Sequence, residues 1–250
     1  MRNSIYRILR EKAEETREKL GTPSFYRALR KELAVSGSSL LRNPAARRCR
    51  SHLDRAKLHP AHGIFHCEKV AVEAGAIVQA ERGDCANDGS ETAELMLCAQ
   101  IAGLLHDITR CRKDHTVTGS IEAALILRDF DISDVYKRYI TAAIRNHEAF
   151  RKARFSGDEP GMLVSNALYD ADKFRWGPDN FTITLWLITE SSGISPETLH
   201  EIFREKMEVI GSIRGTFRTA TGRKYGPEFI DMGITIGNEI YRELCNILGD

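Results

Sequence analysis

The chain has 250 residues, of which 42% are hydrophobic and 28% charged, a balance typical of a globular protein with a sizeable core. Its formal net charge of +1 gives no bulk attraction to nucleic acid or to a membrane surface. No stretch is long enough to predict a membrane span, and residues 1–20 are rich in Arg and Glu, unlike a signal peptide. These features argue against membrane and nucleic-acid partners.

The six cysteines form no C-x-x-C pair of the kind that binds structural zinc. Cys67 and Cys98 fall within helical patterns, where a free cysteine behaves as a small buried hydrophobe. We therefore expect all six to be reduced and the protein to be cytoplasmic.

The first quarter of the chain predicts helices without a chemical motif. Residues 3–19 fit a charged amphipathic helix, residues 24–33 a second helix and residues 45–57 a basic one. We expect this region to pack against the domain that follows or against a second copy of the chain, so a homodimer is one interpretation.

The central part of the chain predicts helices with polar residues at the ends of their apolar stripes. The pattern places these helices at about residues 64–81, 90–105, 117–127, 134–147 and 162–173. Six residues of metal-binding type lie at, or just before, the end of such a stripe: His66, His106, Asp107, His115, His147 and Asp172. Helix ends from one core can converge on one point, so these side chains are predicted to meet.

The last quarter is predicted to be largely helical. Residues 180–190 are apolar and partly β-branched, so a strand is an alternative there. The glycines between Gly222 and Gly226 predict a loop, and Pro227 predicts the start of a final helix. Residues 223–229 combine basic and aromatic side chains with a Gly-Pro pair, and we predict that they lie near the pocket.

The His106-Asp107 pair indicates a metal site when it is taken with the other four residues. A buried His followed by a buried Asp costs free energy unless both are paired or coordinated. Each histidine alone is also explained as a satisfied core residue. Imidazole combined with carboxylate suits Fe, Mn, Co, Ni or Zn better than magnesium alone. We predict one or two divalent metal ions per chain, with Asp107 able to bridge two ions.

Five segments resemble the HD-domain superfamily of metal-dependent phosphohydrolases. They are His66-Cys-Glu-Lys-Val70, Gly103-Leu-Leu-His-Asp-Ile108, His115-Thr-Val-Thr-Gly119, Ile144-Arg-Asn-His-Glu148 and Tyr169-Asp-Ala-Asp-Lys173. The resemblance implies an all-α fold, an HD-domain helical bundle, in a single helical domain over residues 1–250. Residues 59–175 would be the metal-binding core, with residues 1–58 and 176–250 as wrapping helical extensions.

The resemblance also implies a division of the ligands. His66, His106, Asp107 and Asp172 match the basic metal set of the superfamily, whereas His115 and His147 resemble the ligands of members with a second metal. Asn146 stands where the cyclic-dinucleotide phosphodiesterase branch has another histidine, and the Gly-Tyr-Pro signature of that branch is missing. A cyclic-di-GMP phosphodiesterase is therefore not expected.

His62 lies one helical turn before His66. It is interpreted either as a spare ligand or proton shuttle of the site, or simply as a histidine at the entry of a helix.

The leading hypothesis is a phosphohydrolase that acts on a small phosphomonoester or a nucleotide through a metal-activated hydroxide. Asp107, Arg110 and Lys173 are the candidate catalytic residues, since Arg110 and Lys173 follow the metal ligands and can bind phosphate. Two alternatives stay open. One is an HD-type diiron oxygenase, which uses the same ligand order, and the other is a catalytically inert, metal-containing binding or regulatory module.

Overall fold

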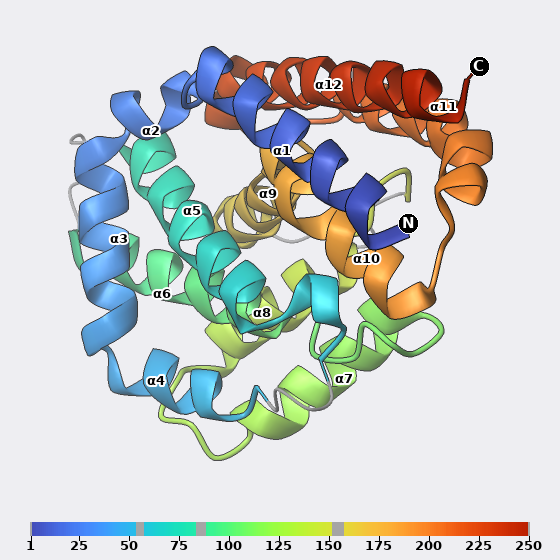
Figure 1. Cartoon of the computed structure of the whole chain (residues 1–250). Helices are drawn as coiled ribbons and strands as arrows, with labels where there is room; N and C mark the ends of the chain where they lie inside the picture. The colour runs from blue at the N-terminus through green and yellow to red at the C-terminus, as the bar shows by residue number, and fades with distance from the viewer. Residues whose placement is uncertain (1, 54–57, 84–88, 152–157, 250) are drawn as a thin grey trace.

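The apolar periodicity of the sequence produces helices throughout the computed structural model. The structure describes residues 2–53, 58–83, 89–151 and 158–249, and every regular element within these ranges is helical (Figure 1). The all-α prediction is therefore confirmed for this part of the chain. None of its helices is both long and apolar enough to cross a bilayer.

The elements follow one another with short connections. The helices before the metal ligands are α1 (Arg2–Leu20), α2 (Ser24–Ala28), α3 (Arg30–Arg42) and α4 (Pro44–Ser51). The central helices are α5 (Ile64–Arg82), α6 (Gly89–Leu105), α7 (His115–Leu127), α8 (Asp134–Asn146) and α9 (Glu159–Phe174). The last helices are α10 (Leu185–Ser192), α11 (Pro196–Ile213) and α12 (Ala220–Leu248). A 3₁₀ turn (Pro60–His62) precedes α5, and a π-helical turn (Asn180–Thr184) precedes α10.

Several helices begin where a short polar side chain caps them. The Asn43 side chain accepts hydrogen bonds from the backbone N–H groups of Ala45 and Ala46, and Pro44 occupies the first turn of α4. Ser195 caps α11 in the same way, as its Ser-Pro-Glu sequence indicates. Such caps satisfy N–H groups that have no partner inside the helix. The basic helix predicted over residues 45–57 is observed only as far as Ser51, in α4; residues 52 and 53 are not helical, and residues 54–57 lie outside the described ranges.

The core is centred on α5 and α6, which pack closely against each other and against α8 and α9. From Leu95 to Leu105 nearly every residue of α6 is buried, so this helix is enclosed on all sides. At Gly103 the two backbones nearly touch, since an added Cβ atom would lie 2.6 Å from Ala71 Cα. This approach brings the first turn of α5, which carries His66, close to the end of α6, which His106 follows.

Helices from the two ends of the described chain cover this core together. Figure 1 shows α1 lying alongside α12, and the contacts between them agree with this view. Tyr6, Leu9 and Ala13 on α1 are buried in that arrangement.

The strand considered for residues 180–190 is not found, because these residues form the π-helical turn and α10. Phe181, Trp186 and Thr189 are buried, which is a helical rather than an alternating spacing. The Trp186 ring packs 6.2 Å from the Tyr6 ring, centroid to centroid. Packing on one helical face therefore outweighs the strand preference of the β-branched residues.

The loop predicted between Gly222 and Gly226 is also wrong, because α12 begins at Ala220 and continues through Pro227. The glycines serve close packing instead of a turn. A Cβ atom at Gly222 would lie 2.0 Å from the Asp170 carboxylate, and one at Gly226 would lie 2.4 Å from the Phe217 ring. The first turn of α12 is held by the Thr219 side chain, which accepts the Gly222 N–H.

Candidate metal centre

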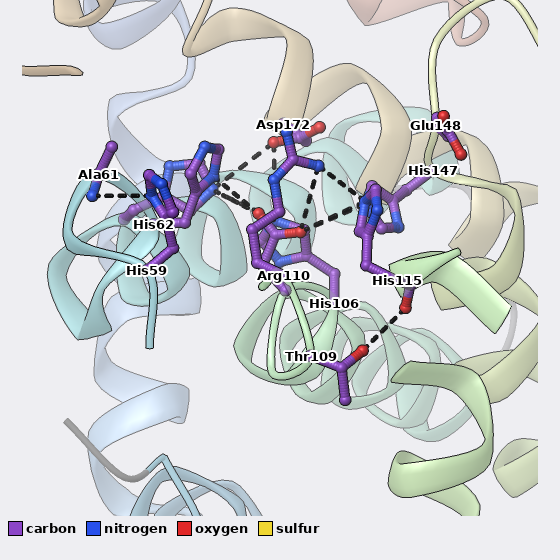
Figure 2. Close-up of polar contacts among 12 residues, drawn as sticks. His59, Ala61, His62, His106, Thr109, Arg110, His115, His147, Glu148 and Asp172 are labelled. Atoms are coloured by element: carbon purple, nitrogen blue, oxygen red, sulfur yellow. Dashed lines mark hydrogen bonds and ion pairs between the residues drawn. The ribbon is translucent and has the colours of Figure 1, made fainter. Parts of the chain in front are cut away.

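The predicted ligands converge on one point from separate segments of the chain. His66 lies in the first turn of α5, His106 and Asp107 follow α6, and His147 follows α8. Asp172 lies in the last turn of α9 and His115 begins α7. Figure 2 shows His62 on one side of the centre and His115 and His147 on the other.

Two of the histidines are fixed by their own helices. His106 donates its Nδ1 hydrogen to the Gly103 carbonyl at 2.8 Å, and His147 donates to the Ile144 carbonyl at 2.7 Å. Both rings are almost fully buried, with exposures of 0% and 2%. These bonds leave the Nε2 lone pair of each ring directed at Asp107, which is how second-shell carbonyls orient metal-binding histidines.

Most distances between the ligand nitrogens and the carboxylate oxygens are longer than a direct hydrogen bond, and His66 Nε2 lies 3.2 Å from His106 Nε2. His106 Nε2 lies 3.3 Å from Asp107 Oδ2 and 3.6 Å from Asp172 Oδ1, and His66 Nε2 also lies 3.6 Å from Asp172 Oδ1. Two atoms that share an ion at about 2.1 Å are roughly 3.0–3.4 Å apart. The ligand atoms of His66, His106 and Asp172 lie within 4.8 Å of one another, as do those of His106, Asp107 and His147.

The Oδ2 atom of Asp107 faces three histidines. His62 Nδ1 lies 2.7 Å away, His106 Nε2 3.3 Å and His66 Nε2 3.8 Å. His62 is therefore part of the cluster, and the interpretation as a mere helix-entry residue does not fit the structure.

The Oδ1 atom of Asp107 faces the other two histidines. It is buried and has no hydrogen-bond partner in the described structure, with His147 Nε2 at 3.6 Å and His115 Nε2 at 3.7 Å. A buried carboxylate oxygen without a donor is costly, and a cation would remove that cost. The donor set and this orphaned atom together fit a metal ion.

Arg110 lies on the same side as His115. Its NH1 donates to His115 Nε2 at 2.7 Å and lies 3.9 Å from Asp107 Oδ1. The Thr109 hydroxyl donates to the His115 carbonyl at 2.9 Å, which ties the connecting turn to the start of α7.

The carboxyl groups of the centre are ionised. Burial alone would raise the pKa of Asp107, but His106 outweighs it and holds this pKa well below its usual range. Burial opposes ionisation of Asp172 as well, yet Lys173 and His106 hold its pKa well below normal. Both carboxylates are therefore charged at neutral pH.

The histidines divide into two kinds. Burial lowers the pKa of His66 to about 3 and that of His115 to about 4, and it lowers the pKa of His147 as well. Burial also favours neutral His106, but Asp107 and Asp172 outweigh it and raise the pKa of His106 to about 10. A metal ion and a proton compete for the same lone pair of His106. The carboxylates that favour the proton on this ring would therefore also favour a metal cation in place of the proton.

Lys173 supports the site by holding a ligand. Its side chain is 4% exposed, and Nζ lies 2.5 Å from Asp172 Oδ2. This ion pair leaves Asp172 Oδ1 facing His66 and His106. Lys173 therefore fixes the orientation of the carboxylate while it also lines the cavity.

The centre lies in a cavity of about 580 Å³. Besides the ligands, Arg110, Lys173 and Arg175 line it, and Trp176, Ile188 and Val209 give it apolar surface. Residues 223–229 do not line this cavity, and Phe229 stacks on Phe174 with 4.2 Å between ring centroids. The segment therefore does not form the wall of the cavity, but it packs beside it, since Phe174 directly follows the lining residue Lys173.

No protein-family model, curated protein or solved structure matches this chain. The resemblance to the HD-domain superfamily therefore stays a prediction carried by the five segments. Sequence reasoning missed Arg175, which lines the cavity and pairs with Glu73. The sequence signal for Arg175 was Glu73, an acidic residue in the apolar stripe of α5 that needs a positive partner when it is buried.

Proposed function

We propose that the chain is a metal-dependent phosphohydrolase of the HD type, which cleaves a small phosphomonoester or a nucleotide. The observation that supports this function best is the convergence of imidazole and carboxylate ligands in a cavity that Arg110 also lines. Ionised Asp172 forms one ligand group with His66 and His106, and ionised Asp107 forms another with His106 and His147. Arg110 and Lys173 provide positive charge beside them.

A divalent ion held by these groups would supply a bound hydroxide at about neutral pH and would polarise a phosphate oxygen. The chain itself would bind and orient the phosphate. Arg110 is suited to this role because its guanidinium is partly exposed in the cavity and can bind two phosphate oxygens at once. Lys173 would keep Asp172 in place instead of binding the phosphate directly.

The apolar part of the cavity would accept the organic part of the substrate. Trp176, Ile188 and Val209 line the same cavity as the ligands. A volume of about 580 Å³ falls in the range of small-molecule sites. The phosphate would therefore lie on the basic side, and an apolar or aromatic leaving group would lie against these three side chains.

The test is phosphate release by protein that is purified and assayed without oxygen. The protein is loaded in turn with Mn, Fe, Co, Ni or Zn and given p-nitrophenyl phosphate and a panel of nucleoside monophosphates. We expect metal-dependent phosphate release that His106→Ala abolishes and that Arg112→Ala, in the exposed turn nearby, leaves unchanged.

Two outcomes would contradict the proposal. Turnover that requires oxygen and a reductant would indicate a diiron oxygenase. A fully loaded protein that binds phosphate esters and releases no phosphate would indicate an inert binding module.

A further inference from the structure

The two oxygen atoms of Asp107 divide the metal centre into two halves. The Oδ2 half consists of Asp107 Oδ2, His66, His106 and Asp172 Oδ1. The Oδ1 half consists of Asp107 Oδ1, His115 Nε2 and His147 Nε2. Each half offers at least three ligand atoms from different segments, so the chemistry of the side chains would allow a cation in either half.

The halves differ in the permanent positive charge that the chain itself brings to them, since a guanidinium does not release its proton. In the described part of the chain, the ion-pair partners of Asp107 Oδ2 are histidines alone. Lys173 contacts Asp172 through Oδ2, the oxygen directed away from His66 and His106. The Oδ1 half, by contrast, already contains the guanidinium of Arg110, as the dashed lines in Figure 2 show.

The contact between Arg110 and His115 is incompatible with metal binding by the same ring nitrogen. NH1 donates to His115 Nε2 at 2.7 Å and so uses the single lone pair of that atom. A metal ion would need this lone pair, and it would also lie within a few ångströms of a fixed positive charge. The guanidinium and a second ion therefore exclude each other.

We infer that Arg110 occupies the position of the second cation, so that the resting centre holds one ion in the Oδ2 half. A second ion enters the Oδ1 half only when Arg110 moves away. This inference rests on the proposed metal centre. It also gives Arg110 two alternative positions, because the same guanidinium cannot contact His115 and a substrate phosphate at once.

The surroundings of Arg110 allow this movement. Its side chain is 36% exposed, so the guanidinium has a path into the cavity. The backbone of the turn is held where it is, because Thr109 bonds to the His115 carbonyl and the Arg110 N–H bonds to the Asp107 carbonyl at 2.9 Å. Rotation of one side chain would therefore open the second position without a change in the ligands.

The test is the metal stoichiometry of the full chain, measured without any activity assay. Wild type and Arg110→Ala are equilibrated with Mn²⁺, and bound metal is counted by elemental analysis. Electron paramagnetic resonance then reports whether two ions are coupled, and calorimetry gives the affinity of each. We expect one ion in wild type and two coupled ions in Arg110→Ala, with the second site at least about tenfold tighter than in wild type.

The matched control is Arg112→Ala, which removes the same charge from an exposed position in the same turn and should leave one ion bound. Adding His115→Ala to Arg110→Ala should return the count to one. Arg110→Gln keeps the length of the side chain without its charge, and it repeats the test if the alanine variant does not fold.

Other results would overturn the inference. Two ions in wild type, with an unchanged second affinity in Arg110→Ala, would show that the guanidinium does not compete. One ion in both proteins would show that the Oδ1 half is not a metal site. Neither result affects the single-ion phosphohydrolase, whereas a chain that binds no metal in any variant would overturn that function as well.

Discussion

Two polar clusters share helix α5 and meet at the end of α9, and they satisfy their charges in different ways. The metal cluster consists of the six predicted ligands together with His62. The second, which we call the ion-pair cluster, consists of Tyr26, Lys69, Glu73, Arg175 and Asp179. His66, Lys69 and Glu73 follow one another along α5, so the two clusters are adjacent in the fold.

The ion-pair cluster is complete in its charges, although the buried Arg175 Nε has no hydrogen-bond partner in the described structure. Arg175 NH2 lies 2.5 Å from Glu73 Oε2 and 3.2 Å from the Tyr26 hydroxyl, and its NH1 pairs with Asp179. Tyr26 in turn donates to Glu73 at 2.7 Å, and Lys69 lies 2.8 Å from Asp179. Two positive and two negative groups thus compensate each other at hydrogen-bonding distance.

The metal cluster is not complete. Its imidazole nitrogens and carboxylate oxygens mostly lie 3.3–3.8 Å apart, and Asp107 Oδ1 has no hydrogen bond in the described structure. Buried charges that already have their partners are a structural feature, whereas a buried carboxylate oxygen without a hydrogen-bond donor favours a cation. The difference teaches that satisfaction, rather than burial, distinguishes a binding site from a buried ion pair.

The largest effect should come from breaking the complete cluster. Arg175→Ala leaves Glu73 and Asp179 without their central partner, and it should lower the free energy of unfolding of the metal-free protein by about 3–5 kcal/mol. Urea denaturation followed by circular dichroism measures this loss. Replacing Glu73 and Arg175 together by Leu and Met should recover much of the stability. A loss below about 1 kcal/mol in the single variant would contradict the account of this cluster.

Metal should stabilise the fold through the incomplete cluster only. At a free ion concentration of 100–1,000 times the dissociation constant, binding should add about 3–4 kcal/mol to the free energy of unfolding of wild type. Asp107→Asn should lose this gain, because it removes a ligand shared by both halves. Arg175→Lys should keep it. Thermal unfolding with and without a chelator provides the measurement, and an equal gain in Asp107→Asn would refute the ligand assignment.

Gly103→Ala tests whether the packing of α5 on α6 sets the geometry of the metal cluster. The new methyl group would lie 2.6 Å from Ala71 Cα, so the helices must separate. We expect a loss of about 1–3 kcal/mol in stability, typical of overpacking, together with weaker metal binding. Gly37→Ala in α3 is the control, since its Cβ atom meets nothing within 4 Å. It should stabilise the protein by about 0.5–1 kcal/mol.

The smallest effect concerns pH in the metal-free protein. Burial, followed by His106, lowers the pKa of His66 in the folded state to about 3, below its ordinary value of 6.5. The unfolded chain therefore binds more protons in this window, and stability falls as the pH falls from 6.5 toward 3. This residue should cost about 1 kcal/mol between pH 6 and pH 5. Denaturation curves of His66→Asn should show a correspondingly weaker pH dependence.

The predicted ligands come together in the structure because each lies at, or next to, the end of a helix that packs in the core. The pairs His106-Asp107 and Asp172-Lys173 keep their predicted proximity, since each lies at a helix end that the apolar stripe had already placed. The role of Arg110 could not be predicted, because its contact with His115 depends on the conformation of the turn between α6 and α7.

The fold was less predictable where long-range contacts replace local preferences. The start of α12 has a capping residue in Thr219, but its glycines favour a loop. Glu81 accepts the N–H groups of Ala220 and Thr221, and Asp170 accepts those of Arg218 and Thr219. These partners are 48 or more residues away in the chain. The carboxylates of Glu81 and Asp170 thus support the start of α12, and Gly222 and Gly226 serve close packing there instead of forming a loop.

The pairing of α1 with α12 has a consequence for synthesis on the ribosome. α1 ends at Leu20 and α12 begins at Ala220, so about 200 residues are translated between them. Until then α1 lacks the helix that it contacts most extensively in the folded chain. The nascent chain thus carries an exposed amphipathic helix during most of its elongation, and it is in that interval that a chaperone has most to bind.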